Sequence, residues 1–365
     1  MSSFEYNGNP SRVIFGSGSI QKLPAELARQ KLSSPIIVST PEQTSHAELV
    51  RDILSKAKDG PVAAAGIYSK AAMHTPAHVT EDAVAFSKKS GADSVVSIGG
   101  GSTTGLGKAI SFLSGIPHVV IPTTYAGSEV TPVLGETKDG KKTTKSDPKI
   151  LPGTVIYDVD LTMSLPPGLS ATSGVNAIAH AVETLYSRTT SPITNLFAIE
   201  GISALANSLP IITSTDASDV PARTAAQYGA WLCGVCLGTV GMALHHKLCH
   251  ALGGSFNMPH AETHTVVLPH ALAYNVAAMP DDLKARLAGA LPGSDGDPVK
   301  GLNVLLTRLG VKRGLKEFGL REEDVDRAAE IATSNPYWNP RPVEREKIRE
   351  LIRRAWAGEE ARADL

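Results

Sequence analysis

The sequence predicts a two-domain chain: an N-terminal α/β dinucleotide-binding domain with a parallel sheet, followed by an all-α C-terminal domain. In residues 1–160, short β-branched runs alternate with amphipathic segments, a pattern typical of a parallel sheet covered on both faces. In residues 161–365, apolar residues recur every three to four positions and β-branched runs are few, which indicates helices. A length of 365 residues agrees with two domains.

The N-terminal domain alternates predicted strands with predicted helices. Thr80 is expected to cap the second helix, because Glu81 and Asp82 would follow it in the first turn and Gly91 stands just past the end. The predicted strands are 36–39, 62–68, 93–98 and 118–121. The other predicted helices are 45–56 and 102–113.

The C-terminal domain shows helical periodicity in seven segments, with a polar loop at 293–298. The predicted helical segments are 170–187, 193–208, 221–252, 262–278, 299–309, 323–333 and 343–356.

The charge balance argues against polyanionic partners. The 35 Lys and Arg residues offset 36 Asp and Glu residues, so we expect no binding to nucleic acid or to an anionic membrane surface. The N-terminus lacks the features of a signal peptide, and the apolar runs are too short for a membrane span. The three cysteines, Cys233, Cys236 and Cys249, lie in one apolar stretch and do not form a disulfide pattern, so we expect buried thiols and a reducing, cytoplasmic location.

A glycine-rich turn follows the strand predicted at 93–98 and opens the next helix. Consecutive glycines let a ligand approach the backbone closely, and the N–H groups of the helical turn favour an anion. We therefore predict a pyrophosphate site here, although the pattern is not GxGxxG. The residues assigned to it are Gly99, Gly100, Gly101, Ser102 and Thr103.

Two further loops leave strands at the end where ligands bind in open α/β sheets. The loop 122–129 offers the hydroxyl groups of Thr123, Thr124 and Ser128 to the cofactor. Thr40 follows the strand 36–39, where an Asp would favour NADH and an Arg would favour NADPH. Neither is present, so the sequence leaves both NADH and NADPH open.

The histidines are concentrated in one region of the C-terminal domain. His246 and His250 are four residues apart, so both project from one helix face, and His260 follows ten residues later. Asn176, His180 and Glu183 have helical spacing on another segment. Together they predict a metal or catalytic site between two helices. Three imidazoles can hold zinc, whereas the neutral amide of Asn176 weakens the case for a metal.

With these motifs, the chain resembles the iron-containing alcohol dehydrogenase superfamily, which shares its architecture with the dehydroquinate synthases, and within it the maleylacetate reductases. The resemblance runs nearly from end to end. The matching segments are GGGSTTGLGKAI (99–110), PTTYAGSEVTP (122–132), TVIYDVDLTMSLPPGLSATSGVNAIAHAVETLY (154–186), HHKLCHALGGSFNMPHAETHTVVLPH (245–270) and NPYWNPRPVER (335–345).

Two departures from the metal-dependent members are informative. Those members resemble GGGSxxD, with Asp where this chain has Gly105, and they have Asp where this chain has Asn176. Their remaining metal ligands fall on residues that the chain retains: His180, His246 and His260. Maleylacetate reductases are generally regarded as needing no metal, so the resemblance implies a metal-free site and leaves the histidines to the substrate.

The resemblance also implies a reaction. NADH or NADPH would reduce the carbon–carbon double bond of maleylacetate, a dicarboxylate, to 3-oxoadipate in the breakdown of aromatic compounds, with the nicotinamide in the cleft between the domains. His250 would supply the proton, and His180, His246 and His260 would hold the oxyanion or the carboxylates. Tyr125 and Asn176 are further candidates for contact with the substrate, and a homodimer is expected because similar proteins form one.

Other functions remain open at this point. A metal-dependent alcohol or aldehyde dehydrogenase of the same fold is the nearest alternative. A lyase related to dehydroquinate synthase fits the loop and tail motifs poorly. A non-catalytic cofactor-binding protein would not need to retain His180, His246, His250 and His260.

Overall fold

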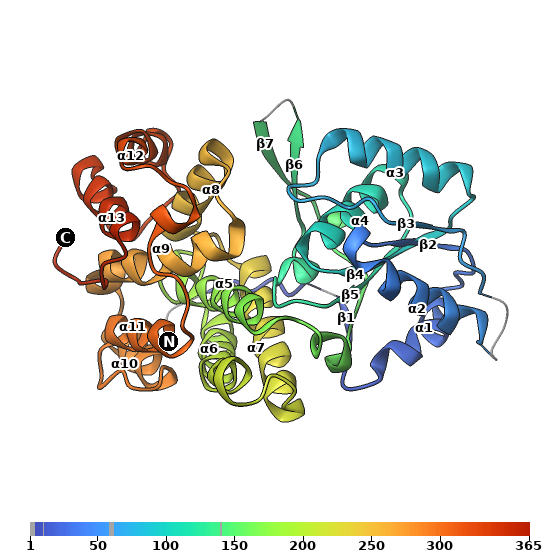
Figure 1. Cartoon of the computed structure of the whole chain (residues 1–365), viewed down its shortest axis with the longest axis horizontal. Coiled ribbons are helices and arrows are strands. Elements are labelled where there is room, and N and C mark those ends of the chain that lie inside the picture. Colours follow the sequence, from blue (N-terminus) through green and yellow to red (C-terminus); the bar gives the residue numbers. More distant parts are fainter. Residues whose placement is uncertain (1–3, 10, 58–61, 139–140) are drawn as a thin grey trace. The chain divides into compact units, whose positions relative to one another are not determined.

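The computed structural model describes residues 4–9, 11–57, 62–138 and 141–365, and they form two compact units (Figure 1). The N-terminal unit runs from Gly8 to Leu165, and the helical unit begins at Pro166 and continues to the C-terminus. Residues 4–7 group with the helical unit.

The N-terminal unit is built on one parallel sheet of six strands in the order β1-β8-β5-β4-β2-β3. The four interior strands carry only buried side chains, as expected for a sheet covered on both faces. The bounds are β1 Arg12–Phe15, β2 Pro35–Val38, β3 Gly66–Tyr68, β4 Ser94–Gly99, β5 His118–Pro122 and β8 Thr154–Tyr157.

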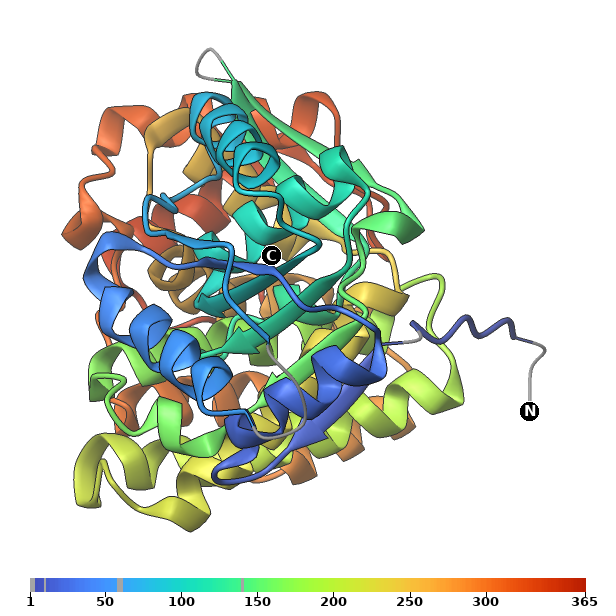
Figure 2. The ribbon, with the colours of Figure 1, turned by 90° about the vertical axis from the view of Figure 1, so that its right-hand side faces the viewer.

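Two apolar layers cover the sheet, because successive side chains of a strand point to opposite faces. Ile37 of β2 packs in the layer formed by helices α1 and α2, whereas its neighbours Ile36 and Val38 pack in the layer formed by α3 and α4. Figures 1 and 2 show this arrangement of helices about the strands. The bounds are α1 Leu23–Arg29, α2 Thr44–Ser55, α3 Ala77–Lys89 and α4 Gly101–Ser114.

Two predictions for this unit are corrected. The strand expected at 62–68 is only β3, because the alanines at 63–65 have low strand propensity. Thr80 is not a helix cap: α3 begins after Pro76, whose carbonyl accepts a hydrogen bond from the Thr80 N–H at 3.1 Å, so Thr80 already lies within the helix.

An antiparallel hairpin was not predicted. It consists of β6 (Val133–Lys138) and β7 (Lys141–Ser146), paired from Val133↔Ser146 to Lys138↔Lys141. The dipeptide Asp139-Gly140 between the two strands is a known hairpin signal that would have predicted it. The edge strand β1 and the strand β8 were also absent from the prediction.

The helical unit consists of nine α-helices among its described residues. The bounds are α5 Pro167–Tyr186, α6 Pro192–Pro210, α7 Val220–Thr239, α8 Leu244–Phe256, α9 His260–Asn275, α10 Asp281–Ala290, α11 Pro298–Arg308, α12 Val325–Ser334 and α13 Arg345–Ala357. The short α10 was not predicted.

The single helical segment expected at 221–252 is two helices, α7 and α8, bent by 93° at residues 240–243. The bend depends on a tertiary contact. The buried carboxylate of Glu183 accepts hydrogen bonds from the backbone N–H of Ala243 at 2.9 Å and of His245 at 2.7 Å, so it caps the start of α8. This contact joins residues 60 or more positions apart, which explains why local periodicity did not reveal the bend.

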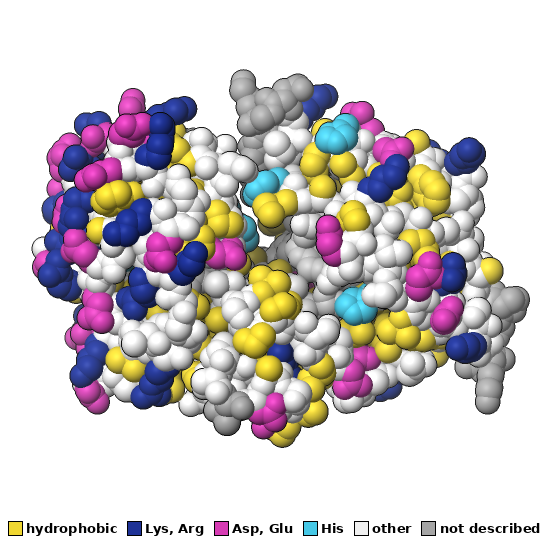
Figure 3. Space-filling model, in the orientation of Figure 1, with side chains coloured by type: hydrophobic (Ala, Val, Ile, Leu, Met, Phe, Trp, Pro, Cys, Tyr) yellow, Lys and Arg dark blue, Asp and Glu magenta, His cyan; other side chains and the backbone are white. Residues whose placement is uncertain are grey.

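The helix α6, with its continuation to Ser214, is long and apolar enough to cross a membrane, although core helices of folded proteins meet the same criterion. Polar residues such as Thr194 and Asn195 interrupt its apolar runs and are buried against the rest of the unit. Over the C-terminal helices, positive and negative side chains are interspersed on the face that Figure 3 shows.

Candidate active site

The predicted pyrophosphate turn joins β4 to α4 in the N-terminal unit. β4 ends at Gly99, which has φ of +147°, and α4 begins at Gly101. A side chain at Gly99 would be strained by this φ, and its Cβ would stand 2.5 Å from the Gln43 Oε1 and the Thr103 Oγ1. The turn is therefore bare backbone at the start of a helix, the arrangement that accepts a phosphate.

The neighbouring loops come together at the same edge of the sheet. The connection after β4 leads toward β5, whereas the one after β2 leads toward β3, so the carboxyl ends of β4 and β2 mark the switch point at which ligands bind in open α/β sheets. The Gln43 Nε2 donates to the Thr123 Oγ1 at 3.1 Å, and the Thr123 N–H donates to the Gly99 carbonyl at 3.0 Å. Thr124 lies beside Gly100, where a Cβ would be 3.1 Å from its Cγ2.

The sequence prediction missed two residues of this edge, Gln43 and Lys108. Lys108 is fully buried, and its Nζ donates to the Ser128 carbonyl, to the Thr131 Oγ1 at 2.8 Å and to the Val133 carbonyl at 2.9 Å. Burial lowers the pKa of Lys108 to about 7, although the charge of Glu129 opposes the shift. Ser128, whose hydroxyl group was predicted to bind the cofactor, thus accepts from Lys108 through its carbonyl oxygen and, at 3.3 Å, through its Oγ.

The remaining predicted residues of the N-terminal unit have separate positions. Ser102 and Thr103 form the first turn of α4, and the buried Thr103 Oγ1 has no hydrogen-bond partner among the described residues. Thr40 precedes the short turn that carries Gln43. Tyr125 is fully buried in the loop after β5. Its predicted contact with the substrate stays a prediction.

In the helical unit, the structure brings the predicted histidines of α5 and α8 into contact. The His180 Nδ1 lies 3.0 Å from the His246 Nε2, and both side chains are buried. Asn176 is one turn before His180 on α5 and is also buried. The spacing argument from the sequence therefore selected side chains that belong to one cluster.

Glu183 determines how the first part of this cluster carries its protons. Its Oε2 lies 2.7 Å from the His246 Nδ1, and its side chain is fully buried. A carboxylate accepts, so His246 donates from Nδ1, its Nε2 accepts, and His180 must donate from its own Nδ1. The Nε2 of a neutral His180 then carries a lone pair. Glu183 stands seven residues after Asn176, but its helical spacing alone did not predict this role.

His250, the predicted proton donor, lies near His246 with ring centroids 6.0 Å apart. Its Nδ1 is 3.0 Å from the hydroxyl group of Tyr337, which lies in the tail segment between α12 and α13. Burial and the charge of Glu183 raise the pKa of Tyr337, so this hydroxyl keeps its proton near neutral pH. His250 therefore has a hydrogen-bonding partner that the histidine spacing did not reveal.

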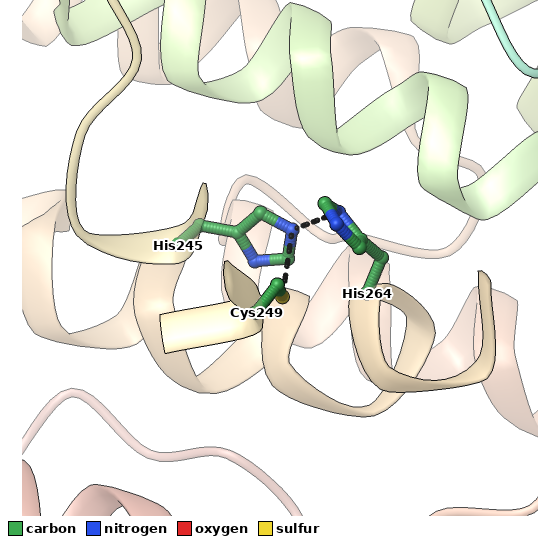
Figure 4. Close-up of side chains that lie close together, drawn as sticks. All are labelled: His245, Cys249 and His264. Carbon is green, nitrogen blue, oxygen red and sulfur yellow. Dashed lines mark hydrogen bonds between the residues drawn. The ribbon is translucent and has the colours of Figure 1, made fainter. Parts of the chain in front are cut away.

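Two further buried histidines, His245 and His264, complete the cluster. His264 is four residues beyond His260 on α9, and the two ring centroids are 4.3 Å apart. The His245 Nε2 lies 2.9 Å from the His264 Nδ1, and the Cys249 Sγ lies 3.7 Å from the His245 Nε2 (Figure 4). Burial, reinforced by the neighbouring histidines, holds the pKa of His245 and His264 well below the ordinary value. The spacing that identified His246 and His250 would also have found His264.

Comparison with known proteins identifies the family. Residues 10–159 match the family described as iron-containing alcohol dehydrogenase, and residues 170–356 match the C-terminal part of the Fe-containing alcohol dehydrogenase family. The chain therefore belongs to the iron-containing alcohol dehydrogenase family, a family of oxidoreductases. This confirms the predicted family resemblance and the predicted fold class.

Several relatives share a more specific name. A maleylacetate reductase from Rhizobium sp. (strain MTP-10005) is 52% identical over 358 residues, which cover 98% of this chain and 99% of that protein. The crystal structure of a maleylacetate reductase from Agrobacterium tumefaciens is 49% identical, with a TM-score of 0.92 over 99% of this chain and all of that one. A putative alcohol dehydrogenase from Ralstonia eutropha JMP134 is 51% identical, with a TM-score of 0.95 over 99% of both chains.

The family name implies iron, and the residues at the family's ligand positions show how an ion could be held. The first of them is Asn176, whose buried Oδ1 accepts no hydrogen bond from the described residues but offers no charge to a divalent ion. The second and third, His180 and His246, are hydrogen-bonded to each other through the His246 Nε2. The Glu183 carboxylate accepts from the other nitrogen of His246, an arrangement that also occurs behind metal-binding histidines. This set therefore lacks the carboxylate that would balance the charge of a divalent iron ion.

A different trio converges instead. His245, Cys249 and His264 each place one ligand atom within 4.8 Å of the other two. Among the described residues, they are the His, Cys, Asp or Glu side chains that form such a set of three. A metal there would need the N–H groups of both imidazoles to have acceptors, yet the His245 Nδ1 and the His264 Nε2 have no hydrogen-bond partner in the described chain. Burial also raises the pKa of Cys249 and opposes a thiolate. The trio is a hydrogen-bonded packing cluster.

Proposed function

We propose that this chain is a maleylacetate reductase that uses NADH or NADPH to reduce the carbon–carbon double bond of maleylacetate, giving 3-oxoadipate. The observation that carries the proposal is an identity of about half to relatives of that name over nearly the whole length of both chains. The family and these relatives imply NAD(P)H as the reductant. The glycine-rich turn at Gly99 supports the same cofactor.

The reaction moves one hydride and one proton. When bound, NAD(P)H would supply the hydride to the alkene carbon β to the ketone and would be oxidised to NAD(P)⁺. The π electrons move toward the ketone, so an enolate forms with its negative charge on oxygen. The carbon α to the ketone then gains a proton, and the ketone reforms. The chain must therefore stabilise an oxyanion and deliver one proton.

The histidine cluster can meet both requirements. A proton on the His180 Nε2 makes that atom a donor to the enolate oxygen, and the charge is compensated through His246 by the Glu183 carboxylate. His260 lies in the same cluster and is assigned to the oxyanion or to a substrate carboxylate. His250, which has Tyr337 at its other side, is assigned as the proton donor to carbon.

We further propose that the reaction needs no metal. The proposal is supported by the donor set, in which an amide stands at the first family ligand position and the buried imidazoles of His180 and His246 bond each other. Prolonged dialysis against a strong chelator should leave the rate of NADH oxidation with maleylacetate unchanged. Loss of activity on chelation, restored by iron or zinc, would contradict the proposal and favour a metal-dependent alcohol or aldehyde dehydrogenase.

The assignment of His250 is tested separately. His250→Ala should lower kcat by about 10²–10⁴-fold, the usual contribution of a positioned general acid, with little change in the affinity for NADH. His78→Ala, on α3 of the N-terminal unit, is the control. Comparing maleylacetate with simple aldehydes as substrates for the wild-type protein distinguishes the two reductase functions. A homodimer in the cytoplasm belongs to the same proposal, and light scattering of the purified protein tests the dimer.

A further inference from the structure

His264 is in contact with each of the three histidines at the family's metal-ligand positions. Its ring centroid lies 4.3 Å from that of His260, 5.0 Å from that of His246 and 6.3 Å from that of His180. The side chain is fully buried. These three neighbours lie on α5, α8 and α9, so the His264 ring contacts a histidine from each of these helices.

A hydrogen bond to a second buried histidine fixes the position of the His264 ring. Its Nδ1 is hydrogen-bonded to the His245 Nε2 at 2.9 Å, and the two ring centroids are 4.8 Å apart. The Cys249 Sγ lies 3.7 Å from the same His245 Nε2 (Figure 4). A ring held in this way cannot move aside without breaking a buried hydrogen bond.

A metal ion and this imidazole would compete for the same role. An ion bound by three histidines must lie about 2.0–2.1 Å from one nitrogen of each, so all three nitrogens must point to one centre. In the described chain, the ligand atoms of His180, His246 and His260 do not form such a set of three. The common neighbour of the three rings is the imidazole of His264 instead.

We propose that His264 takes the place of the family's metal ion as the group that fixes the geometry of His180, His246 and His260. It is a positioning residue: it touches the proposed catalytic rings and does not itself bind the substrate. The inference rests on the proposed metal-free function. It explains how a site that lacks the carboxylate ligand can keep three imidazoles in one arrangement.

Four proteins test this proposal: the wild type, Asn176→Asp, His264→Ala, and the double variant. Cobalt(II) is the probe, because its visible d–d absorption reports tetrahedral nitrogen and oxygen ligands, and the bound metal is counted by mass spectrometry. We expect stoichiometric cobalt with d–d bands only in the double variant, in which the carboxylate is restored and the central ring is removed. Stoichiometric cobalt in Asn176→Asp alone would overturn the proposal, because His264 would then not occupy the place of the ion.

Kinetics provide a second test if His264→Ala proves poorly folded. His264→Gln retains a polar side chain but no ring, and it should lower kcat at least tenfold while the KM for NADH stays within twofold. The matched control is His270→Gln, which replaces another buried histidine of α9 that is outside the cluster and should leave kcat unchanged. An unchanged kcat in His264→Gln would refute the positioning role.

The outcome for His264 can be separated from that for the proposed function. Whether the wild type reduces maleylacetate is measured directly, and the cobalt result does not depend on that rate. Stoichiometric metal in the purified wild type that disappears in Cys249→Ala would place an ion at His245, Cys249 and His264 and would overturn the inference. Wild-type protein free of stoichiometric metal supports it.

Discussion

Glu183 provides the sharpest test of the proposed chemistry. Its carboxylate accepts from the His246 Nδ1 at 2.7 Å, and this bond fixes the direction of the next one, from the His180 Nδ1 to the His246 Nε2. In Glu183→Gln, the side-chain amide would face the His246 Nδ1 with an N–H group. His246 would then donate from Nε2, and His180 would have to accept at Nδ1. The proton on the His180 Nε2 would lose its compensating charge.

We expect a large fall in kcat and a measurable loss of stability. The glutamine Oε1 can still accept from the backbone N–H of His245, but the Ala243 N–H shares its acceptor oxygen with His246 and would face the amide N–H group, so the cap on α8 is weakened. Loss of the hydrogen bond between the His246 Nδ1 and the charged carboxylate costs about 1.5–3 kcal/mol of the free energy of unfolding. Replacing a carboxylate behind a catalytic histidine by its amide can lower kcat by about 10⁴-fold, so we expect a fall of about 10²–10⁴-fold here.

The assay is NADH oxidation with maleylacetate, measured together with thermal unfolding and NADH binding. Glu200→Gln on α6, an exposed position, is the control for the removal of one carboxylate and should leave all three quantities unchanged. If Glu183→Gln retains kcat within threefold of the wild type, the hydrogen-bond chain from Glu183 to His180 does not carry the reaction and the mechanism is wrong.

Two other predictions concern the N-terminal unit. Gly99→Ala should weaken NADH binding at least tenfold in a fluorescence titration, because φ of +147° and two oxygen atoms 2.5 Å from the new Cβ force the turn to shift; Gly168→Ala, with open space around its Cβ, should not. Burial alone would raise the pKa of Glu26, but hydrogen bonds led by that from Arg29 outweigh it and lower the pKa to about 2. Since the folded state thus favours the ionised form, Glu26→Gln should cost about 1–3 kcal/mol of unfolding free energy above about pH 5, and the difference from wild type should vanish as the pH falls toward 2; an unchanged difference at low pH would contradict this.

The sequence was informative where local spacing determines structure. The alternation of strands and helices, the glycine-rich turn and the face shared by His246 and His250 all follow from periods of two or three to four residues. It was uninformative where a distant group decides. The break between α7 and α8 is capped by Glu183 from α5, and the role of Lys108 depends on a loop about 20 residues later in the chain. Such contacts leave no periodic trace in the sequence.

The proposed mechanism also accounts for the change at Asn176 in terms of charge. In the metal-dependent arrangement, a divalent ion and one aspartate leave a single net positive charge to face the substrate oxygen. In this chain the amide is neutral, and one extra proton on the imidazole of His180 supplies a single positive charge at the same place. Restoring the aspartate without an ion would cancel that charge. Asn176→Asp alone should therefore lower kcat in the proposed reaction, whereas the same change would be required for activity through a metal.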